Sequence, residues 1–309
     1  MRRRKEREHY RQLKKGYYHL STDGWKDGFL FHTNSQYAYG MTVIGMLTIL
    51  FDVKIYAFTL MPNHIHIILS GTGVDCLGAF DYFCKMISAR LTKDGCQPLP
   101  EDYWFKLAAI EDPQQMKNNI IYVDRNPYEQ AVCVPSGYPW GSAYLHFSFI
   151  NKMIAGERAD SYSRRELDRI TCSRKPIPDH WLFHNEYGLL PSSFVDDSLF
   201  SRLFHTPKEY ESRLVKDYEA FVKVARSLEE SVEYTIEEAE EIVRTILRDY
   251  YSGRKFDKLS NDEKGQFANI LTNKYNMSET LISSALNVSE KLIRQFLRAK
   301  DYSNMRSVR

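Results

Sequence analysis

Paired cysteines, an excess of one charge and long apolar runs are all scarce in this sequence of 309 residues. Its five cysteines form no Cys-X-X-Cys pair, which argues against a zinc cluster and fits a reducing compartment. The apolar stretch at 41–51 is too short to span a bilayer, and no apolar segment of a signal peptide follows the basic N-terminus. We therefore expect a cytoplasmic protein with no membrane partner.

Charge is distributed unevenly although the formal net charge is only +2. Residues 1–15 contain eight Arg or Lys against two Glu, whereas residues 229–241 contain seven Glu. Basic segments can contact phosphate groups, so both ends of the chain are candidate nucleic-acid contacts, although residues 1–15 could equally be a solvated disordered arm. The candidate residues are Arg2, Arg3, Arg4, Lys5, Lys291, Arg294 and Arg298.

Apolar periodicity predicts an alternation of strands and helices in the first half of the chain. The order β-α-β-β-α-β-α is typical of an α+β fold, here a ferredoxin-like antiparallel sheet with helices on one face. The predicted strands are 17–22, 54–60, 64–69 and 103–110, and the predicted helices are 35–50, 75–92 and 113–126.

The chain is expected to divide into four parts. A basic tail at 1–15 precedes the predicted α+β domain at 16–150, and an irregular connector at 151–204, rich in Pro, Gly, Ser and aromatic residues, follows it. From 205 to 309 the periodicity is helical, which predicts an all-α C-terminal region. Within it, residues 278–298 resemble a helix-turn-helix, because Asn287 interrupts the pattern and Ser289 can cap a second helix.

The segment at 62–69 (Pro-Asn-His-Ile-His-Ile-Ile-Leu) is the sharpest motif in the sequence. Residues two apart on a strand share a face, so His64 and His66 point to one side while Ile65 and Ile67 point into a core. Two imidazoles about 6–7 Å apart along a strand can hold one divalent metal ion. A bare His-X-His is more often a pair of packing or surface histidines, so the motif needs support from its surroundings.

A second motif is carried by the predicted helix at 113–126. Tyr122 and Asn126 are four residues apart and therefore adjacent on one helix surface. Gln115 and Asn119 fall on the same polar stripe. Because Pro127 follows Asn126, we expect Asn126 at the helix end.

Together these motifs resemble the single-tyrosine HUH transposases, in particular the REP-associated tyrosine transposases. Residues 61–66 match the Met-Pro-Asn-His-hydrophobic-His context of that family, and residues 122–127 (Tyr-Val-Asp-Arg-Asn-Pro) correspond to its Tyr-Ile-His-x-Asn-Pro segment. Residues 138–142 (Tyr-Pro-Trp-Gly-Ser) stand where a Tyr-Pro-Trp-Ser-Ser segment usually follows. The chain departs from the family at 123–125 and extends far beyond the resemblance, which covers roughly 16–150.

The resemblance implies a metal-dependent tyrosine DNA endonuclease and strand transferase. It implies Mg²⁺ or Mn²⁺ bound by His64, His66 and Asn126, with Tyr122 as the nucleophile that forms a 5′-phosphotyrosine. The implied partner is single-stranded or hairpin DNA, and the protein would act as a monomer or homodimer.

Two other interpretations stay open. The chain could be a catalytically silent, host-adopted DNA-binding regulator that uses residues 278–298. It could also be a conjugative relaxase or replication initiator, although those relatives usually have longer chains and additional catalytic residues.

Overall fold

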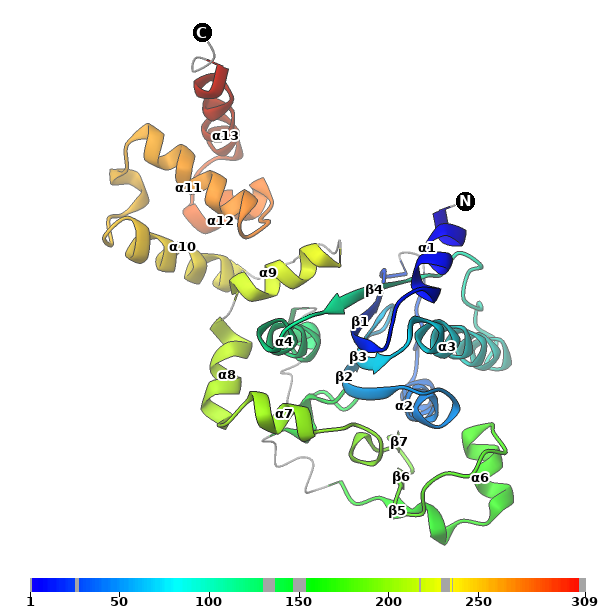
Figure 1. The fold of residues 1–309 in the computed structure, drawn as a ribbon. Helices are drawn as coiled ribbons and strands as arrows, with labels where there is room; N and C mark the ends of the chain where they lie inside the picture. Colours follow the sequence, from blue (N-terminus) through cyan, green and yellow to red (C-terminus); the bar gives the residue numbers. More distant parts are fainter. Residues whose placement is uncertain are drawn as a thin grey trace. The chain divides into compact units, whose positions relative to one another are not determined.

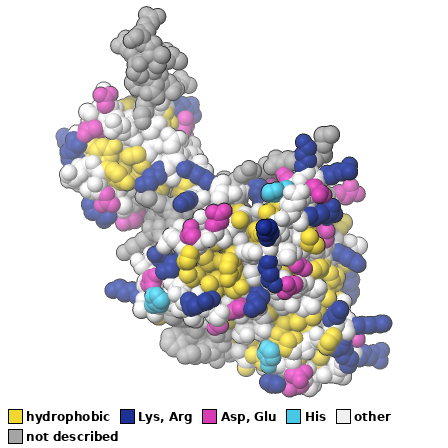
Figure 2. Space-filling view, viewed as in Figure 1, with side chains coloured by type: hydrophobic (Ala, Val, Ile, Leu, Met, Phe, Trp, Pro, Cys, Tyr) yellow, Lys and Arg dark blue, Asp and Glu magenta, His cyan; other side chains and the backbone are white. Residues whose placement is uncertain are grey.

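The computed structural model describes residues 2–25, 28–129, 137–146, 154–216, 218–228, 234 and 236–305. The chain forms two compact units, Met1–Leu214 and Val215–Arg309. Within the described residues, no helix is long and apolar enough to cross a membrane. Figure 2 shows Lys and Arg side chains interspersed with Asp and Glu side chains on the visible face.

The first unit is built on a four-stranded antiparallel sheet (Figure 1). Its strands are β1 (Gly16–Thr22), β2 (Lys54–Leu60), β3 (Ile65–Gly71) and β4 (Phe105–Ile110), in the order β2-β3-β1-β4. Strands β2 and β3 pair as an antiparallel hairpin. Strand β3 begins one residue later than predicted, so His64 lies just before it. The predicted α+β class is confirmed at this level.

Helices cover both faces of the sheet. Helices α2 (Asn34–Leu50) and α3 (Gly73–Lys93) pack over the apolar side chains of one face, including Leu20, Ile67 and Phe58. Helix α4 (Pro113–Glu129) covers the opposite face, where Ile68 and Ile120 share a second core (Figure 1). The predicted placement of helices on one face is therefore wrong. The side chains on both faces of β3 make apolar contacts, and its polar residue His66 is buried beneath α4.

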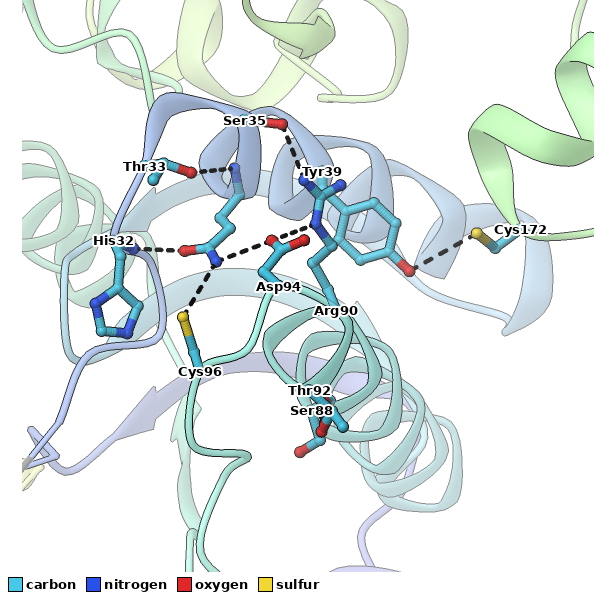
Figure 3. Close-up of polar contacts among 11 residues, drawn as sticks. His32, Thr33, Ser35, Tyr39, Ser88, Arg90, Thr92, Asp94, Cys96 and Cys172 are labelled. Carbon is cyan, nitrogen blue, oxygen red and sulfur yellow. Dashed lines mark hydrogen bonds and ion pairs between the residues drawn. The ribbon is translucent and has the colours of Figure 1, made fainter.

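A polar cluster around the buried Gln36 side chain joins the beginning of α2 to the end of α3 (Figure 3). The Gln36 side chain accepts a hydrogen bond from the His32 amide and donates one to Asp94. Arg90 donates to the same carboxylate at 2.7 Å and to the Ser35 hydroxyl at 2.9 Å. The Arg90 guanidinium lowers the pKa of Asp94. This network satisfies the polar groups of Gln36 that burial would otherwise leave unpaired.

The N-terminal residues form helix α1 (Arg2–Arg11), which packs on α3. Its Tyr10 is buried and accepts a hydrogen bond from the Leu107 amide, and Arg7 forms an ion pair with Asp81. The interpretation of 1–15 as a disordered arm is therefore wrong for these residues, because an apolar anchor and an ion pair hold the helix in place.

Residues 154–203 carry more structure than the predicted irregular connector. A three-stranded sheet contains β5 (Glu157–Arg158), β6 (Leu182–His184) and β7 (Gly188–Leu189), beside helices α6 (Arg164–Thr171) and α7 (Ser198–Leu203). This segment packs on α2 so closely that a Cβ atom at Gly45 would lie 2.2 Å from Leu189. Gly188 has a φ of +70°, which favours glycine. Helix α8 (Pro207–Lys216) follows it.

The described residues of the second unit are helical. They comprise α9 (Tyr218–Ser227), α10 (Ile236–Tyr250), α11 (Asn261–Asn273), α12 (Glu279–Leu286) and α13 (Glu290–Met305). Asn287 adopts the left-handed conformation that ends α12, and Ile282 and Ile293 are buried. Helices α12 and α13 thus form a short-turn pair at the segment predicted to resemble a helix-turn-helix.

Candidate active site

The sheet face beneath α4 carries buried polar side chains on its two central strands. His19 and Ser21 of β1 point to this face because they alternate with Leu20, which lies in the other core. His66 of β3 is directly opposite Ser21 in the antiparallel register. His19 and His66 are fully buried, so their hydrogen bonds must be made within the protein.

His64, His66 and Asn126 meet at one point between the sheet and α4. Nε2 of His64 lies 2.9 Å from Oδ1 of Asn126, and Nε2 of His66 lies 3.1 Å from Nδ2 of the same amide. The two imidazole rings are 5.0 Å apart between centroids. Two ring nitrogens and one side-chain amide therefore converge at one point.

Helix α4 brings Tyr122 to the same place. The Tyr122 ring lies 5.4 Å from the His66 ring and 5.8 Å from the His19 ring, both edge-on. Its exposed fraction is only 3%, so the candidate nucleophile sits inside the site. Asn119, Tyr122 and Asn126 form one stripe of α4, since residues three and four apart share a helix face.

The end of α4 is tied to the sheet at Pro127. Contrary to the prediction that the helix ends at Asn126, α4 continues to Glu129 with Pro127 inside it. Proline has no N–H, so the Val123 carbonyl four residues earlier loses its helical donor. The Thr59 hydroxyl of β2 donates to that carbonyl at 2.8 Å. The helix thus passes through a proline without leaving a buried acceptor unpaired.

Thr59→Val is expected to lower the free energy of unfolding by about 1–3 kcal/mol, because it leaves the buried Val123 carbonyl unsatisfied. Urea unfolding at neutral pH measures the change. Thr48→Val is a matched control, since Thr48 donates to the Gly45 carbonyl inside α2, which already has its helical partner. Equal destabilisation by the two substitutions would contradict the role assigned to Thr59.

Burial shifts the pKa of His66 in the site and of Asp124 on the other side of α4. Burial lowers the pKa of His66 well below 6.5, and the charge of His64 lowers it further, so His66 is neutral at pH 7. On the opposite side of α4, burial raises the pKa of Asp124 to about 7. The Tyr210 hydroxyl donates to Asp124 at 2.7 Å. Asp124 therefore anchors α4 to α8 and does not face the histidines.

Two further polar groups lie on the same sheet face beside His66. Ser21 pairs with His66 on one side and with Lys106 of β4 on the other. Its hydroxyl is buried and has no hydrogen-bond partner among the described residues. The Lys106 ammonium is 3.3 Å from the Asp23 carboxylate, which is largely exposed. A hydroxyl donor therefore adjoins His66, and a lysine lies one strand further along the same face.

Comparison with known proteins gives little beyond the geometry. No protein-family model and no curated protein matches the chain. One solved structure that it resembles is described as a REP-associated tyrosine transposase bound to a REP hairpin, with 18% identity and a TM-score of 0.35. The match covers 44% of this chain and 81% of that chain.

The candidate DNA contacts differ in whether their side chains already have partners within the protein. Arg3 donates to the backbone carbonyls of Glu101 and Asp102, while Arg4 and Lys5 are exposed on α1. The side chains of Arg2 and Arg298 lie outside the described residues. Lys291 is exposed on α13. Their roles stay predictions.

Arg294 of α13 is held by two carboxylates, Glu279 at 2.6 Å and Glu290 at 3.0 Å. The residues of the Tyr-Pro-Trp segment are also engaged. Trp140 is buried and stacks on Tyr37, and the Tyr138 hydroxyl donates to the Leu60 carbonyl. Trp140 therefore belongs to the apolar core.

Sequence reasoning missed His19. It lies 47 residues from His66 in the chain, and its Nε2 is 3.1 Å from Nδ1 of His66. Alternation along residues 17–22 places His19 on the face opposite Leu20, so the strand pattern held the signal for its orientation. The pairing of β1 with β3, which brings it to His66, could not be read from local pattern.

Proposed function

We propose that this protein is a metal-dependent tyrosine DNA endonuclease and strand transferase acting on single-stranded or hairpin DNA. The observation that carries the proposal is the convergence of His64, His66 and Asn126 at one buried point, with the Tyr122 ring beside it. The order β2-β3-β1-β4 with antiparallel pairs supports a ferredoxin-like assignment of the sheet.

The residues at this point fit a divalent cation. Both Nε2 atoms already face the same amide, and a neutral imidazole such as that of His66 is the form that binds a metal. Within the described ranges no group of three His, Cys, Asp or Glu side chains is placed to hold a metal ion, so the third ligand would be Oδ1 of Asn126. Two imidazoles and one amide oxygen suit Mn²⁺ or Mg²⁺, and imidazole favours Mn²⁺. The bound ion would polarise the scissile phosphate as a Lewis acid.

Tyr122 would be the nucleophile. Its phenolic oxygen attacks phosphorus, an O–P bond forms, and the bond from phosphorus to the 3′-oxygen breaks. The proton lost by the tyrosine is balanced by the proton gained at the new 3′-hydroxyl. The phosphodiester is conserved as a 5′-phosphotyrosine, so attack by another 3′-hydroxyl reverses the chemistry on a different strand and returns the proton to Tyr122.

Ser21 and Lys106 would contact the oxygens of the scissile phosphate. The Ser21 hydroxyl is a buried donor beside His66, and the Lys106 ammonium supplies positive charge next to it. A phosphate that displaces the exposed Asp23 from Lys106 would replace one ion pair with another. Because these groups lie between α4 and the sheet, the substrate has to be an unpaired strand.

The decisive experiment is a covalent-adduct assay. The protein is incubated with Mn²⁺ and labelled hairpin DNA from the flanks of its own gene, then analysed on a denaturing gel. Wild type is expected to give a shifted band, and Tyr122→Phe is expected to reduce it by at least about 10³-fold because the nucleophile is lost. Tyr56→Phe is the control, since Tyr56 is another tyrosine on this side of the sheet and its hydroxyl bonds to Ser70.

Binding of several hairpins without any adduct, in wild type and variant alike, would contradict the enzyme. It would favour the DNA-binding regulator, in which helices α12 and α13 would make the contact.

A further inference from the structure

An unbroken chain of hydrogen bonds runs from α4 through β1 to β3. Nδ2 of Asn119 donates to the Gln115 carbonyl at 2.8 Å. Oδ1 of Asn119 lies 2.7 Å from Nδ1 of His19, and Nε2 of His19 lies 3.1 Å from Nδ1 of His66. Nε2 of His66 then faces Asn126. The four side chains of Asn119, His19, His66 and Asn126 are buried, so water does not substitute for these partners.

The first link of this chain fixes the position of every proton after it. A carbonyl oxygen only accepts, so the Asn119 amide must turn its nitrogen to Gln115 and its oxygen to His19. His19 must then carry its proton on Nδ1, which leaves the lone pair of Nε2 toward His66. His66 in turn donates from Nδ1 to that lone pair. The remaining lone pair of His66, on Nε2, points at the site where His64 and Asn126 converge.

We infer that His19, oriented by Asn119, is a positioning residue that holds His66 as the Nδ1–H tautomer with its Nε2 lone pair toward the candidate metal site. The inference rests on the proposed function for the meaning of that lone pair. His64 also has a partner behind it, since Nδ1 of His64 lies 2.8 Å from Oδ1 of Asn63, but its Nε2 faces the Oδ1 acceptor of Asn126 and so carries a proton that a metal ion would displace. Each histidine thus has a partner behind it, the usual outer-shell support of a metal-binding imidazole.

The tautomer is measurable without any metal. The ¹⁵N chemical shifts of the two ring nitrogens of His66 are measured in the metal-free full-length protein at pH 7.5. Wild type is expected to carry the proton on Nδ1. His19→Leu removes the acceptor and is expected to give a mixture of tautomers. His19→Gln places an amide oxygen where Nε2 was and is expected to restore the Nδ1–H form. Wild-type His66 protonated on Nε2 would overturn the inference.

The consequence for binding is measured with Mn²⁺ alone, by calorimetry on the same proteins. His19→Leu is expected to weaken Mn²⁺ binding by about 10- to 100-fold, the range typical of outer-shell partners, whereas His19→Gln stays close to wild type. His146→Leu is the control for a buried histidine remote from the site. Equal Mn²⁺ affinity in wild type and His19→Leu would overturn the positioning role.

The two readouts separate failure of this inference from failure of the proposed function. If wild type holds His66 as Nδ1–H but forms no DNA adduct, the positioning role of His19 stands and the nuclease function is rejected. If His19→Leu forms as much adduct as wild type and its His66 tautomer is unchanged, the nuclease function stands and the positioning role of His19 is rejected.

Discussion

Asn126→Ala is expected to weaken Mn²⁺ binding by about 100-fold, equivalent to about 2.7 kcal/mol, because it removes the only oxygen ligand of the proposed set. Asn126→Asp is expected to bind Mn²⁺ more tightly than wild type, since a carboxylate is a stronger ligand for this ion than an amide. The Asn126 amide lies within 3.1 Å of both Nε2 atoms, so either change acts at the centre of the site. Titration calorimetry with Mn²⁺ measures both affinities.

Asn118→Ala is the matched control, because Asn118 belongs to the same helix but is bonded to Gln114 away from the site. It is expected to bind Mn²⁺ like wild type. If Asn126→Ala binds Mn²⁺ as tightly as this control, Asn126 is not a ligand. If Asn126→Asp binds more weakly than wild type, a carboxylate at this position does not improve the site.

Much of the sheet could be predicted because its signals are local. The alternation at 62–69 gave the orientation of His64 and His66, and the four-residue spacing placed Tyr122 beside Asn126 on one helix surface. These contacts lie within single elements, so periodicity is enough to orient them. The convergence of the two elements on one point needed the structure.

Other features were not predictable because they depend on pairing between distant strands. His19 meets His66 only because β1 inserts between β3 and β4. Pro127 stays inside α4 only because Thr59 of β2 supplies the missing hydrogen bond. Each local rule was overridden by one tertiary contact, and both contacts lie at the candidate site.

Asp124, where residues 122–127 depart from the motif that they resemble, is held by a tertiary contact. At 3.6 residues per turn, Asp124 lies on the side of α4 away from Tyr122 and Asn126. There it accepts from Tyr210 of α8, a helix far beyond the region of resemblance. Asp124 therefore helps the rest of this unit to support α4, while the groups that face His66 lie on the other side of the helix.

Acid is expected to destabilise the protein through His146. This side chain is buried, stacks on Phe200 with ring centroids 3.5 Å apart, and has an Nε2 without a hydrogen-bond partner among the described residues. Burial lowers its pKa from 6.5 to about 3. His146 therefore gains a proton near pH 6.5 in the unfolded chain but only near pH 3 in the folded protein. The free energy of unfolding falls as the pH falls through that window. The contribution is at most about 5 kcal/mol in total and about 2 kcal/mol between pH 7.5 and pH 5.

His146→Phe keeps the ring on Phe200 but cannot take up a proton, so the free energy of unfolding should depend less on pH by that amount. Urea unfolding at pH 7.5 and pH 5 measures the difference, and the exposed His180→Gln should keep the wild-type dependence. The candidate site is the same in both proteins, so the difference between wild type and His146→Phe isolates His146. An unchanged dependence in His146→Phe would mean that the folded protein accepts a proton at His146, and hence that the pocket beside Phe200 opens to water above pH 5.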